Sequence, residues 1–356
     1  MKEFQKFYKN KKVFVTGHTG FKGSWLVSVL KELGANVIGF SLNDEKRKNY
    51  ERFFSDKNIK NIYFDIQDYN KLFISLEKSE PEIVFHLAAQ SLVFKSYSDP
   101  LQTFNTNIIG SLNVMEACRK IKSIKSVVIV TSDKCYKNIE KKTGYRETDS
   151  LGGDDPYSAS KAAVEICFHS YFKSYFSKNS LKVGFATARA GNVVGGGDWS
   201  EDRLIPDCIR AIINNKKLFI RNPQATRPWQ HVLEPIYGYL KLGMKLFHDP
   251  KKFSGSWNFG PNSGQIHSVK KVVKIITNFF ENKKEIKIKL KKNLLKETKL
   301  LQLNCDKAKS ILLWKTKWSI EKTIKSTCQW YFEYMNKNNL KLLTKRQIYE
   351  YFQKYN

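Results

Sequence analysis

Two short segments of the sequence combine residues that can exchange protons. Tyr157 and Lys161 are four positions apart, a spacing that places both side chains on one face of a helix. A lysine ammonium beside a phenol favours the phenolate, so this tyrosine can act as a base near neutral pH. Ser132 can hydrogen-bond the same oxygen or a substrate hydroxyl. Together, these three side chains predict the oxidation of an alcohol.

Asp133 and Lys134 follow Ser132 directly and add an acid and a base that simple alcohol oxidation does not need. Lys134 has to be uncharged to accept a proton, and burial or a neighbouring cation such as Lys161 favours the neutral amine. The alternative is a surface ion pair in a loop. The doublet comes straight after an apolar strand, where ligands bind in α/β proteins. We therefore predict an elimination coupled to an internal redox step, and leave open which residue is the acid.

The elements that must hold these residues alternate between strands and helices, which predicts an α/β fold with a Rossmann-type, doubly wound parallel sheet. We assign residues 1–190 to this nucleotide-binding domain and 191–356 to a smaller C-terminal substrate-binding lobe. We leave open whether part of residues 191–356 belongs to the first domain. Apolar runs predict strands at 12–16, 36–40, 62–65, 82–86, 126–131 and 183–189, with helices at 24–33, 68–78, 101–121 and around Tyr157.

The pattern changes from Gly191 onward, where strands and helices no longer alternate regularly. A glycine-rich loop covers 195–199, and 217–235 contains short strands and loops rich in Arg, Pro and Trp. Residues 285–305 are rich in Lys and Leu and have strand character. Helices are expected at 204–214, 234–247, 269–280, 319–336 and 345–355.

A GxxGxxG turn lies between the first strand and the first helix. Glycines let the backbone approach a pyrophosphate, whose charge is stabilised by the helix N-terminus. A tight turn alone would explain one glycine and not three, so we predict dinucleotide binding, although the spacing differs from the dehydrogenase GxGxxG. The residues of this turn that we assign to the cofactor are Gly17, Thr19, Gly20, Phe21, Lys22 and Gly23.

The choice between NAD and NADP depends on the end of the second strand. Ser41 stands where an acid would bind the ribose, and Asp44 and Arg47 lie just beyond it. An acid favours NAD, whereas an arginine can receive the 2′-phosphate of NADP; we favour NAD. Asp65 and Ile66, after the third strand, are assigned to the adenine edge, with a capped turn as the alternative for Asp65.

Composition sets the remaining limits. A net charge of +29 could indicate nucleic-acid binding, but the chain contains no nucleic-acid-binding motif, and a compositional bias toward lysine is the alternative. The six cysteines have neither CxxC nor metal-ligand spacing, so we expect reduced thiols and no metal. The apolar runs are too short to span a membrane, and no signal peptide is recognised. We expect a cytoplasmic protein that binds neither nucleic acid nor membrane.

Four motifs together resemble the extended short-chain dehydrogenase/reductases that act on nucleotide sugars. They are the glycine turn 17–23, HLAAQ at 86–90, the Tyr157/Lys161 pair and RAGN at 189–192. Further motifs narrow the resemblance to the branch of nucleotide-sugar 4,6-dehydratases that acts on CDP-glucose. These are TSDKCY at 131–136, GGGDW at 195–199, DRLIPD at 202–207, RNP at 221–223, RPWQHV at 227–232 and WNFGP at 257–261.

One position separates the branches of this family. The enzymes for dTDP-glucose or GDP-mannose carry a glutamate after the aspartate, whereas the CDP-glucose enzymes resemble this chain in having a lysine, here Lys134. The resemblance implies NAD as cofactor and conversion of CDP-glucose to its 4-keto-6-deoxy sugar. It also implies a homodimer or higher oligomer and a role in deoxysugar supply for cell-surface polysaccharide such as O-antigen.

The resemblance also implies further binding residues. A nucleotide diphosphate needs cations, and arginine suits phosphate oxygens best; Arg227 is the first choice. For Trp199 and Trp229, the alternative to substrate binding is packing in the core. For His86 and His231, the alternative is a structural hydrogen bond. The additional cofactor residues are Leu87, Ala88, Ala89, Gln90 and Asn107, with Tyr157 and Lys161. The substrate residues are Asn192, Trp199, Arg203, Arg221, Arg227, Trp229, His231 and Asn258.

Two other functions compete with this interpretation. The first is another nucleotide-sugar enzyme, either a dehydratase of different specificity or an epimerase. Lys134 and the Asp198–Trp199 loop argue against an epimerase, because epimerases need no elimination pair. A non-catalytic NAD(P)-binding regulator is the more distant alternative. Such proteins often lack the tyrosine or the lysine, and this chain has both.

Overall fold

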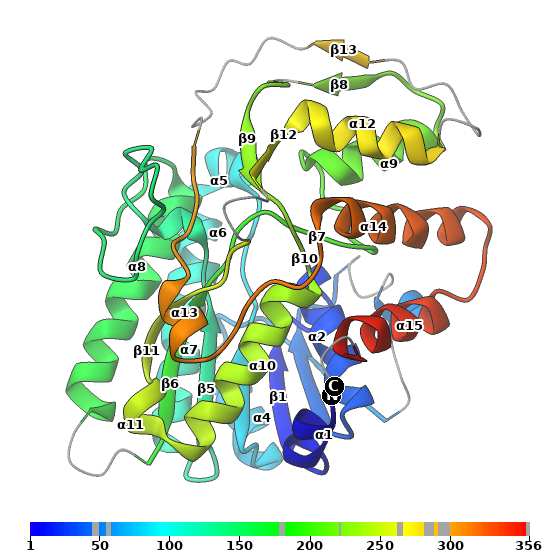
Figure 1. The fold of residues 1–356 in the computed structure, drawn as a ribbon. Coiled ribbons are helices and arrows are strands. Elements are labelled where there is room, and N and C mark those ends of the chain that lie inside the picture. Colours follow the sequence, from blue (N-terminus) through cyan, green and yellow to red (C-terminus); the bar gives the residue numbers. More distant parts are fainter. Residues whose placement is uncertain are drawn as a thin grey trace.

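A seven-stranded parallel sheet forms the centre of the molecule (Figure 1). The computed structural model describes residues 1–44, 50–54, 58–177, 182–220, 222–261, 266–280, 288–290 and 300–353. The strand order is β11-β6-β5-β4-β1-β2-β3, so the direction of winding reverses between β1 and β4. The strands are β1 (Lys12–Thr16), β2 (Asn36–Ser41), β3 (Lys60–Tyr63), β4 (Ile83–His86), β5 (Ser126–Val130), β6 (Gly184–Arg189) and β11 (Gly255–Asn258).

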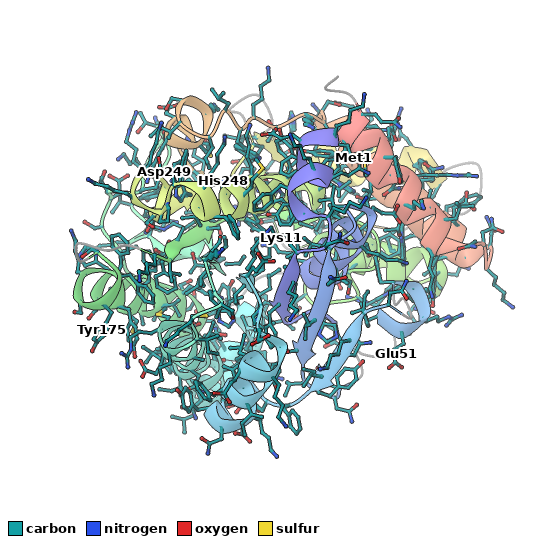
Figure 2. The ribbon with its side chains drawn as sticks, turned by 90° about the horizontal axis from the view of Figure 1, so that it is seen from below. Met1, Lys11, Glu51, Tyr175, His248 and Asp249 are labelled. Carbon is teal, nitrogen blue, oxygen red and sulfur yellow. The ribbon has the colours of Figure 1, made fainter. Side chains whose placement is uncertain are left out.

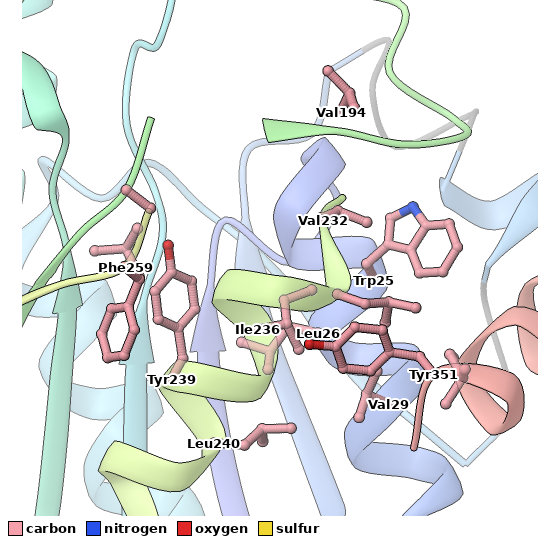
Figure 3. Packing of buried hydrophobic residues seen from close by; sticks show 14 of the residues in the cluster. Trp25, Leu26, Val29, Val194, Val232, Ile236, Tyr239, Leu240, Phe259 and Tyr351 are labelled. Carbon is pink, nitrogen blue, oxygen red and sulfur yellow. The ribbon is translucent and has the colours of Figure 1, made fainter. Parts of the chain in front are cut away.

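Side chains alternate between the two faces of this sheet, as the period of a strand requires. In β1, Val13 and Val15 belong to one buried cluster and Phe14 to the other. Helices α2 (Phe21–Glu32) and α10 (Leu233–His248) pack in the first cluster, which Figure 3 shows around Trp25 and Ile236. Helices α4 (Tyr69–Ser79), α7 (Gly110–Lys120) and α8 (Pro156–Tyr171) pack in the second. Both faces are therefore covered, which confirms the doubly wound α/β prediction.

Most predicted elements of the first half are present, with shifts of a few residues at their ends. Helix α2 begins at Phe21, directly after Gly20, because the glycine turn leads into it without a linker. Strand β3 ends at Tyr63, before Asp65. The helix predicted at 101–121 consists of α6 (Pro100–Phe104), a π-helical turn at Asn105–Ile109 and α7.

The second half builds a smaller lobe above the carboxyl ends of the strands (Figure 1). Within it, helix α12 packs against both α9 and α14. Strand β11 also comes from the second half, yet it pairs in parallel with β6 and extends the main sheet. The lobe contains β7 (Val193–Val194), α9 (Leu204–Ile213), β8 (Leu218–Ile220), β9 (Thr226–Pro228), β10 (Gln230–His231), β12 (Ile266–Ser268), α12 (Val269–Phe280), β13 (Ile288–Leu290) and α14 (Ile320–Met335).

Four short helices and the longer C-terminal helix α15 complete the described fold. Helix α1 (Lys2–Tyr8) precedes β1 and is held by a hydrogen bond of 2.7 Å from the Tyr8 hydroxyl to the carbonyl of Leu240. Figure 2 shows Lys11 and His248 at the lower end of the molecule, opposite the carboxyl ends of the strands. The others are α5 (Val93–Ser98), α11 (Pro250–Phe253), α13 (Asp306–Ser310) and α15 (Leu340–Gln353). No helix in the described part of the chain is long and apolar enough to cross a membrane.

A buried carboxylate ties the C-terminal segment to α10. Glu234, in the first turn of α10, accepts hydrogen bonds from the backbone N–H groups of Lys317 (3.0 Å) and Trp318 (2.8 Å) and from the hydroxyl of Tyr351 (2.6 Å). Burial raises the pKa of Glu234 to about 7, although these hydrogen bonds oppose the shift. This side chain therefore changes charge near neutral pH at the junction of three segments.

Candidate active site

The predicted elimination pair lies in a single 3₁₀ turn, Asp133–Cys135, directly after β5. Ser132 is the N-cap of this turn: its Oγ accepts a hydrogen bond from Lys134 N (3.2 Å) and donates one to Asp133 Oδ1 (3.0 Å). Asp133 is only 4% exposed, while Lys134 is half-buried. The turn therefore holds Ser132, Asp133 and Lys134 in one place, at the edge where the strands end.

Helix α8 brings Tyr157 and Lys161 to the same region. The helix starts at Pro156, and the N-cap Asp155 accepts a hydrogen bond from Ser158 N (2.9 Å), so Tyr157 falls in the first turn. Burial raises the pKa of Tyr157 to about 12, although a hydrogen bond with Ser132 lowers it. The phenol is therefore protonated near neutral pH in this structure.

The cations around this phenol differ from the simple expectation. We predicted Lys161 as a cation that favours the phenolate, and Arg203 acts on Tyr157 in the same direction. Burial lowers the pKa of Lys161 to about 8. The pKa of Lys22 is also lowered to about 8, mainly by burial and further by the charges of Arg203 and Lys161. The negative charge of Asp133 opposes this shift. Lys22, predicted for the cofactor phosphates, thus interacts with the catalytic groups as well.

The loop after β6 encloses the Asp133 carboxylate. A Cβ atom added at Gly191 would lie 1.8 Å from Asp133 Oδ2 and 2.1 Å from its Cγ. No other residue type fits here unless the carboxylate moves. The next residue, Asn192, has a φ of 45°, in the left-handed region. Gly191 therefore fixes the position of the Asp133 carboxylate, and the RAGN motif has a steric role beside it.

The glycine turn has the shape that a dinucleotide requires. Gly17 has a φ of 70°, and a Cβ there would lie 2.6 Å from the backbone N of Ala88. A Cβ at Gly23 would lie 2.1 Å from the carbonyl oxygen of Gly17, and Gly20 is the N-cap of α2. Side chains are thus excluded where the helix N-terminus is open to a phosphate, so the residues present fit an NAD pyrophosphate.

The loop after β4 is connected to α8 through Asn107. Its carboxamide accepts a hydrogen bond from Gln90 N (2.8 Å) and donates to Gln90 O (3.0 Å) and Ser160 Oγ (2.8 Å). Asn107 lies in the π-helical turn, which accounts for its direction toward α8. Leu87 and Ala88 donate backbone hydrogen bonds to Thr16 Oγ1 (3.1 and 3.2 Å). The loop predicted for the cofactor, including Ala89, is therefore held from both sides.

The residues predicted for the adenosine end have local roles. Asp65 Oδ1 accepts a hydrogen bond from Gln67 N (2.9 Å), the capped turn that we kept as the alternative. The Ile66 side chain is buried in the core. Ser41 Oγ accepts from Thr19 N (3.3 Å) and supports the glycine turn. Arg47 lies outside the described residues.

Arg203 connects the two halves of the molecule over the site. Its guanidinium pairs with Asp198 Oδ2 (3.0 Å) and donates to the hydroxyl of Ser91 (3.3 Å), in the loop after β4. The side chain is 35% exposed. Nothing in the sequence pattern indicated Ser91, because the contact joins segments more than a hundred residues apart. Substrate binding by Arg203 stays a prediction.

The remaining lobe residues are more scattered. Trp199 packs against Tyr331, at 5.1 Å between ring centroids, which favours the packing alternative. Arg227 lies in β9, which pairs with β12. Trp229 is buried and donates from Nε1 to His267 O (3.1 Å), again a packing role. Arg221 lies outside the described residues.

Two residues predicted to contact the substrate are buried in the protein. His231 is fully buried, and its ring packs against Trp25 and Trp318 at centroid distances of 5.5 and 4.6 Å. Asn258 is also fully buried; its Oδ1 accepts from the Tyr136 hydroxyl (2.8 Å) and its Nδ2 donates to two backbone carbonyls. The Nδ1 atom of His231 accepts a hydrogen bond from Leu233 N (3.3 Å), while its buried Nε2 has no hydrogen-bond partner among the described residues. This packing favours structural roles for both side chains. His86 is structural too: its ring nitrogens bond the hydroxyls of Thr16 and Ser111.

The glycine turn at the first strand–helix junction, the reversal of winding beside it and the Ser132, Tyr157 and Lys161 set define an extended short-chain dehydrogenase/reductase. The profile of the GDP-mannose 4,6 dehydratase family matches residues 14–327. The chain belongs to this family.

Relatives within and around the family support the same assignment. The CDP-glucose 4,6-dehydratase of Salmonella typhimurium is 40% identical over 350 residues, covering 97% of each chain. Among solved structures, an epimerase from Methanothermobacter thermautotrophicus has a TM-score of 0.81 at 26% identity and covers 97% of each chain. A dTDP-glucose 4,6-dehydratase from Bacillus anthracis, in complex with NAD, has a TM-score of 0.74 at 23% identity, covering 91% of this chain and 97% of its own. The fold is thus shared by epimerases and dehydratases, and does not itself choose the reaction.

Proposed function

We propose that this protein is a 4,6-dehydratase that converts CDP-glucose to CDP-4-keto-6-deoxyglucose and water, with NAD as cofactor. The observation that carries the proposal is the Asp133–Lys134 pair, held by Ser132 in one turn beside Tyr157. An epimerase has no use for a second acid and base at this place. The 40% identity to a CDP-glucose 4,6-dehydratase along nearly the whole chain supports the choice of sugar nucleotide.

The glycine turn and the loop after β4 would hold the cofactor. Gly17, Gly20 and Gly23 leave the backbone at the N-terminus of α2 accessible, and Ala88 lies against Gly17. When bound, NAD supplies the hydride acceptor for C4 of the sugar and the hydride donor for C6. A substrate oxidised and reduced within one catalytic cycle requires no net change in the cofactor.

The oxidation depends on proton transfer to Tyr157. Its phenolate accepts the proton of the C4 hydroxyl while the C4 hydrogen leaves as hydride, so C4 becomes a ketone. Ser132, which is hydrogen-bonded to Tyr157, steadies the reacting oxygen. Arg203 and a charged Lys161 favour the phenolate, which opposes the effect of burial. The site thus prepares the base electrostatically.

The elimination depends on the turn after β5. The 4-keto group acidifies the C5 hydrogen, and Lys134, as a neutral amine, removes it. Asp133, when protonated, gives its proton to the C6 hydroxyl, which leaves as water and creates a C5–C6 double bond. Hydride addition at C6 and return of the proton to C5 complete the 4-keto-6-deoxy sugar. Gly191 keeps the Asp133 carboxyl in place for this step.

The smaller lobe would hold the nucleotide. Arg203 acts electrostatically on Tyr157 and bonds Ser91 in the loop after β4, and Arg227 lies on β9 of the smaller lobe, so these two cations are our choices for the diphosphate. Asn192 follows Gly191 at the edge of the site. The second lobe therefore supplies the cations, and the first lobe the proton-transfer groups.

We also propose a homodimer that uses the α7–α8 side of the molecule. Large apolar side chains are exposed on segments adjoining α7 and on α8 with its extension: Leu101 of α6 (75%), Ile109 just before α7 (45%), Ile166 of α8 (60%) and Tyr175 in the turn after α8 (56%). Such a patch on a dinucleotide-binding domain suits a self-complementary interface. A cytoplasmic enzyme supplying deoxysugar for cell-surface polysaccharide such as O-antigen would agree with six free cysteines and a nucleotide-sugar substrate.

The test is an incubation of purified protein with NAD and each of CDP-glucose, dTDP-glucose, UDP-glucose and GDP-mannose, followed by mass spectrometry. We expect the mass of one water to be lost from CDP-glucose, without net reduction of NAD. Water loss from another of these sugars would keep the mechanism and replace the substrate. A product of unchanged mass with inverted C4 would favour an epimerase and refute the elimination.

A further inference from the structure

A buried ion pair lies directly beneath the catalytic turn. Arg189, the last residue of β6, pairs with Glu165 of α8 at 2.8 Å between Nη2 and Oε2. The two side chains are only 3% and 1% exposed. Burying two charges is costly unless their remaining hydrogen-bonding groups also find partners. The contacts around this pair therefore indicate what it is for.

The Glu165 carboxylate connects helix α8, which carries it, with three strands of the sheet. Oε1 accepts a hydrogen bond from the Thr131 hydroxyl (2.5 Å) at the end of β5. Oε2 accepts from the hydroxyls of Thr187 in β6 (2.8 Å) and Ser256 in β11 (3.0 Å). With the helix that carries it, one carboxylate fixes the relative position of α8, β5, β6 and β11.

Arg189 extends the connection to the far end of the catalytic turn. Its Nη1 donates to the Tyr136 hydroxyl (2.6 Å) and to the backbone oxygen of Glu147 (3.3 Å). The guanidinium also lies over the Tyr136 ring, 4.8 Å from its centroid. Tyr136 in turn donates to Asn258 Oδ1 (2.8 Å). The ion pair thus reaches the residues that flank the turn on both sides, Thr131 before it and Tyr136 after it.

The same pair is also aligned with the proton-transfer residues of α8. Tyr157, Lys161 and Glu165 follow one another at four-residue intervals, so all three side chains lie along one face of the helix. Glu165 acts on Lys161 to raise its pKa, against the effect of burial. The negative charge of Glu165 is therefore within electrostatic reach of the groups that favour the phenolate.

We propose that Glu165, paired with Arg189, is a positioning residue of the proposed dehydration. It holds the Ser132–Lys134 turn against α8, and its charge balances Arg189 so that the field at Lys161 and Tyr157 is set by the catalytic groups. This claim deepens the proposed function and rests on it. Neither residue reaches the substrate, since both are enclosed by Thr131, Thr187 and Tyr136.

The charged and titratable groups facing these two proton-transfer residues come from several elements. The groups that interact electrostatically or by a hydrogen bond with Tyr157 or Lys161 come from the turn after β5 (Ser132, Asp133 and Cys135), from α8 and its N-cap (Asp155 and Glu165), from the start of α9 (Arg203) and from α2 (Lys22). In addition to burial, Lys161 lowers the pKa of His86 in β4, and Tyr157 raises the pKa of Tyr239 in α10. Of these, only Glu165 is compensated by a fully buried cation.

The consequence has a definite sign. Glu165→Gln removes one negative charge and leaves Arg189 positive, so the potential at Tyr157 and Lys161 becomes more positive. A more positive potential favours the deprotonated form of both groups. In the pH profile of kcat/KM, the limbs that report the titration of Tyr157 and Lys161 should both move to lower pH, by on the order of one pH unit.

Three matched variants separate charge from structure. Thr187→Val removes one hydrogen bond to Glu165 without changing any charge, so both limbs should stay in place whatever happens to kcat. Arg189→Met leaves Glu165 without its cation and should move both limbs to higher pH. The pair Glu165→Gln/Arg189→Met restores the net charge and should return the limbs toward their wild-type positions.

The outcomes are decisive for the claim. Unchanged limbs in every folded single charge variant, or a double variant that keeps the full shift, would overturn the positioning role and leave the ion pair purely structural. If Glu165→Gln does not fold, Arg189→Met carries the test with the opposite sign. Should the wild-type protein release no water from CDP-glucose, the proposed function fails separately. The ¹³Cε resonance of Lys161, titrated by NMR in the same variants, then tests the charge claim without turnover.

Discussion

Gly191→Ala is the substitution that tests the placement of the acid most sharply. The new Cβ would lie 1.8 Å from Asp133 Oδ2, whereas an ordinary non-bonded contact is about 3.5 Å. The carboxylate must therefore retreat by roughly 1.5 Å, and a displacement of about 1 Å at a reacting group can cost about 100-fold in rate. We expect water release to slow by about 100-fold, within the range of about 10²–10⁴-fold that a general acid contributes.

The assay separates the two halves of the reaction. Water loss from CDP-glucose is followed by mass spectrometry, and proton exchange at C5 is followed in D₂O. Since the backbone N–H of Lys134 keeps its hydrogen bond to Ser132 Oγ, C5 exchange should continue while water loss is slowed. The control is Gly152→Ala, where the added Cβ would lie 3.2 Å from the Lys137 Cβ. It should change water release by less than about threefold, because that contact needs only a small adjustment.

A double-mutant cycle shows whether the effect passes through Asp133. In an Asp133→Ala background there is no carboxylate to displace, so Gly191→Ala should cost almost nothing more. An equal loss in both backgrounds would mean that the loop itself is disturbed. A fully active Gly191→Ala variant would refute the assignment of Asp133 as the acid, and leave Lys134 or another group to protonate the leaving hydroxyl.

The other predictions concern the base, the lobe and the fold. Tyr157→Phe should lower kcat by about 10³-fold with an unchanged thermal midpoint, because only the proton acceptor is removed; near-wild-type kcat would exclude it as the base. Arg203→Lys loses the fork that joins Asp198 and Ser91, so KM for CDP-glucose should rise about tenfold while kcat changes less; an effect on kcat alone would contradict a substrate contact. Glu234 has a folded pKa of about 7, above its unfolded value, so it stabilises the fold at low pH. Its contribution, about 3 kcal/mol at most, should be lost as pH rises from about 5 to 8; urea unfolding of Glu234→Gln should lack this dependence, and equal pH slopes would argue against it.

Much of the catalytic centre could be predicted because its residues are close in sequence. Ser132, Asp133 and Lys134 share one turn, and Tyr157 and Lys161 share one helix face, so spacing alone brings each set together. The glycine turn is similarly local. The whole first half alternates between strand and helix strongly enough to give the sheet, and even the shift of α2 to Phe21 is small.

Contacts between distant segments could not be predicted in this way. The Asp133 carboxylate meets Gly191, and Arg203 reaches Ser91, only because the fold brings separate loops to one edge of the sheet. Asn258 was expected at the substrate because the family resemblance implied it, whereas in the structure it lies in β11, buried against Tyr136. That strand has four residues, half of them small and polar, too few for a clear period-two signal.

Glu165 is a residue whose position on the helix could be predicted from the sequence but whose role could not. Its position two helical turns after Tyr157 was visible in the sequence, but an acid on a helix is usually exposed. Only the burial of Glu165 and its pairing with Arg189 distinguish it from a surface residue.

The most direct test of the account follows the fate of one hydrogen. CDP-glucose carrying deuterium at C4 is incubated with the protein and NAD, and the product is examined by NMR and mass spectrometry. Internal hydride transfer predicts that the deuterium is found at C6 of the 4-keto-6-deoxy sugar, with a solvent-derived hydrogen at C5. Deuterium that remains at C4, or that is lost to solvent while water is eliminated, would contradict the proposed reaction.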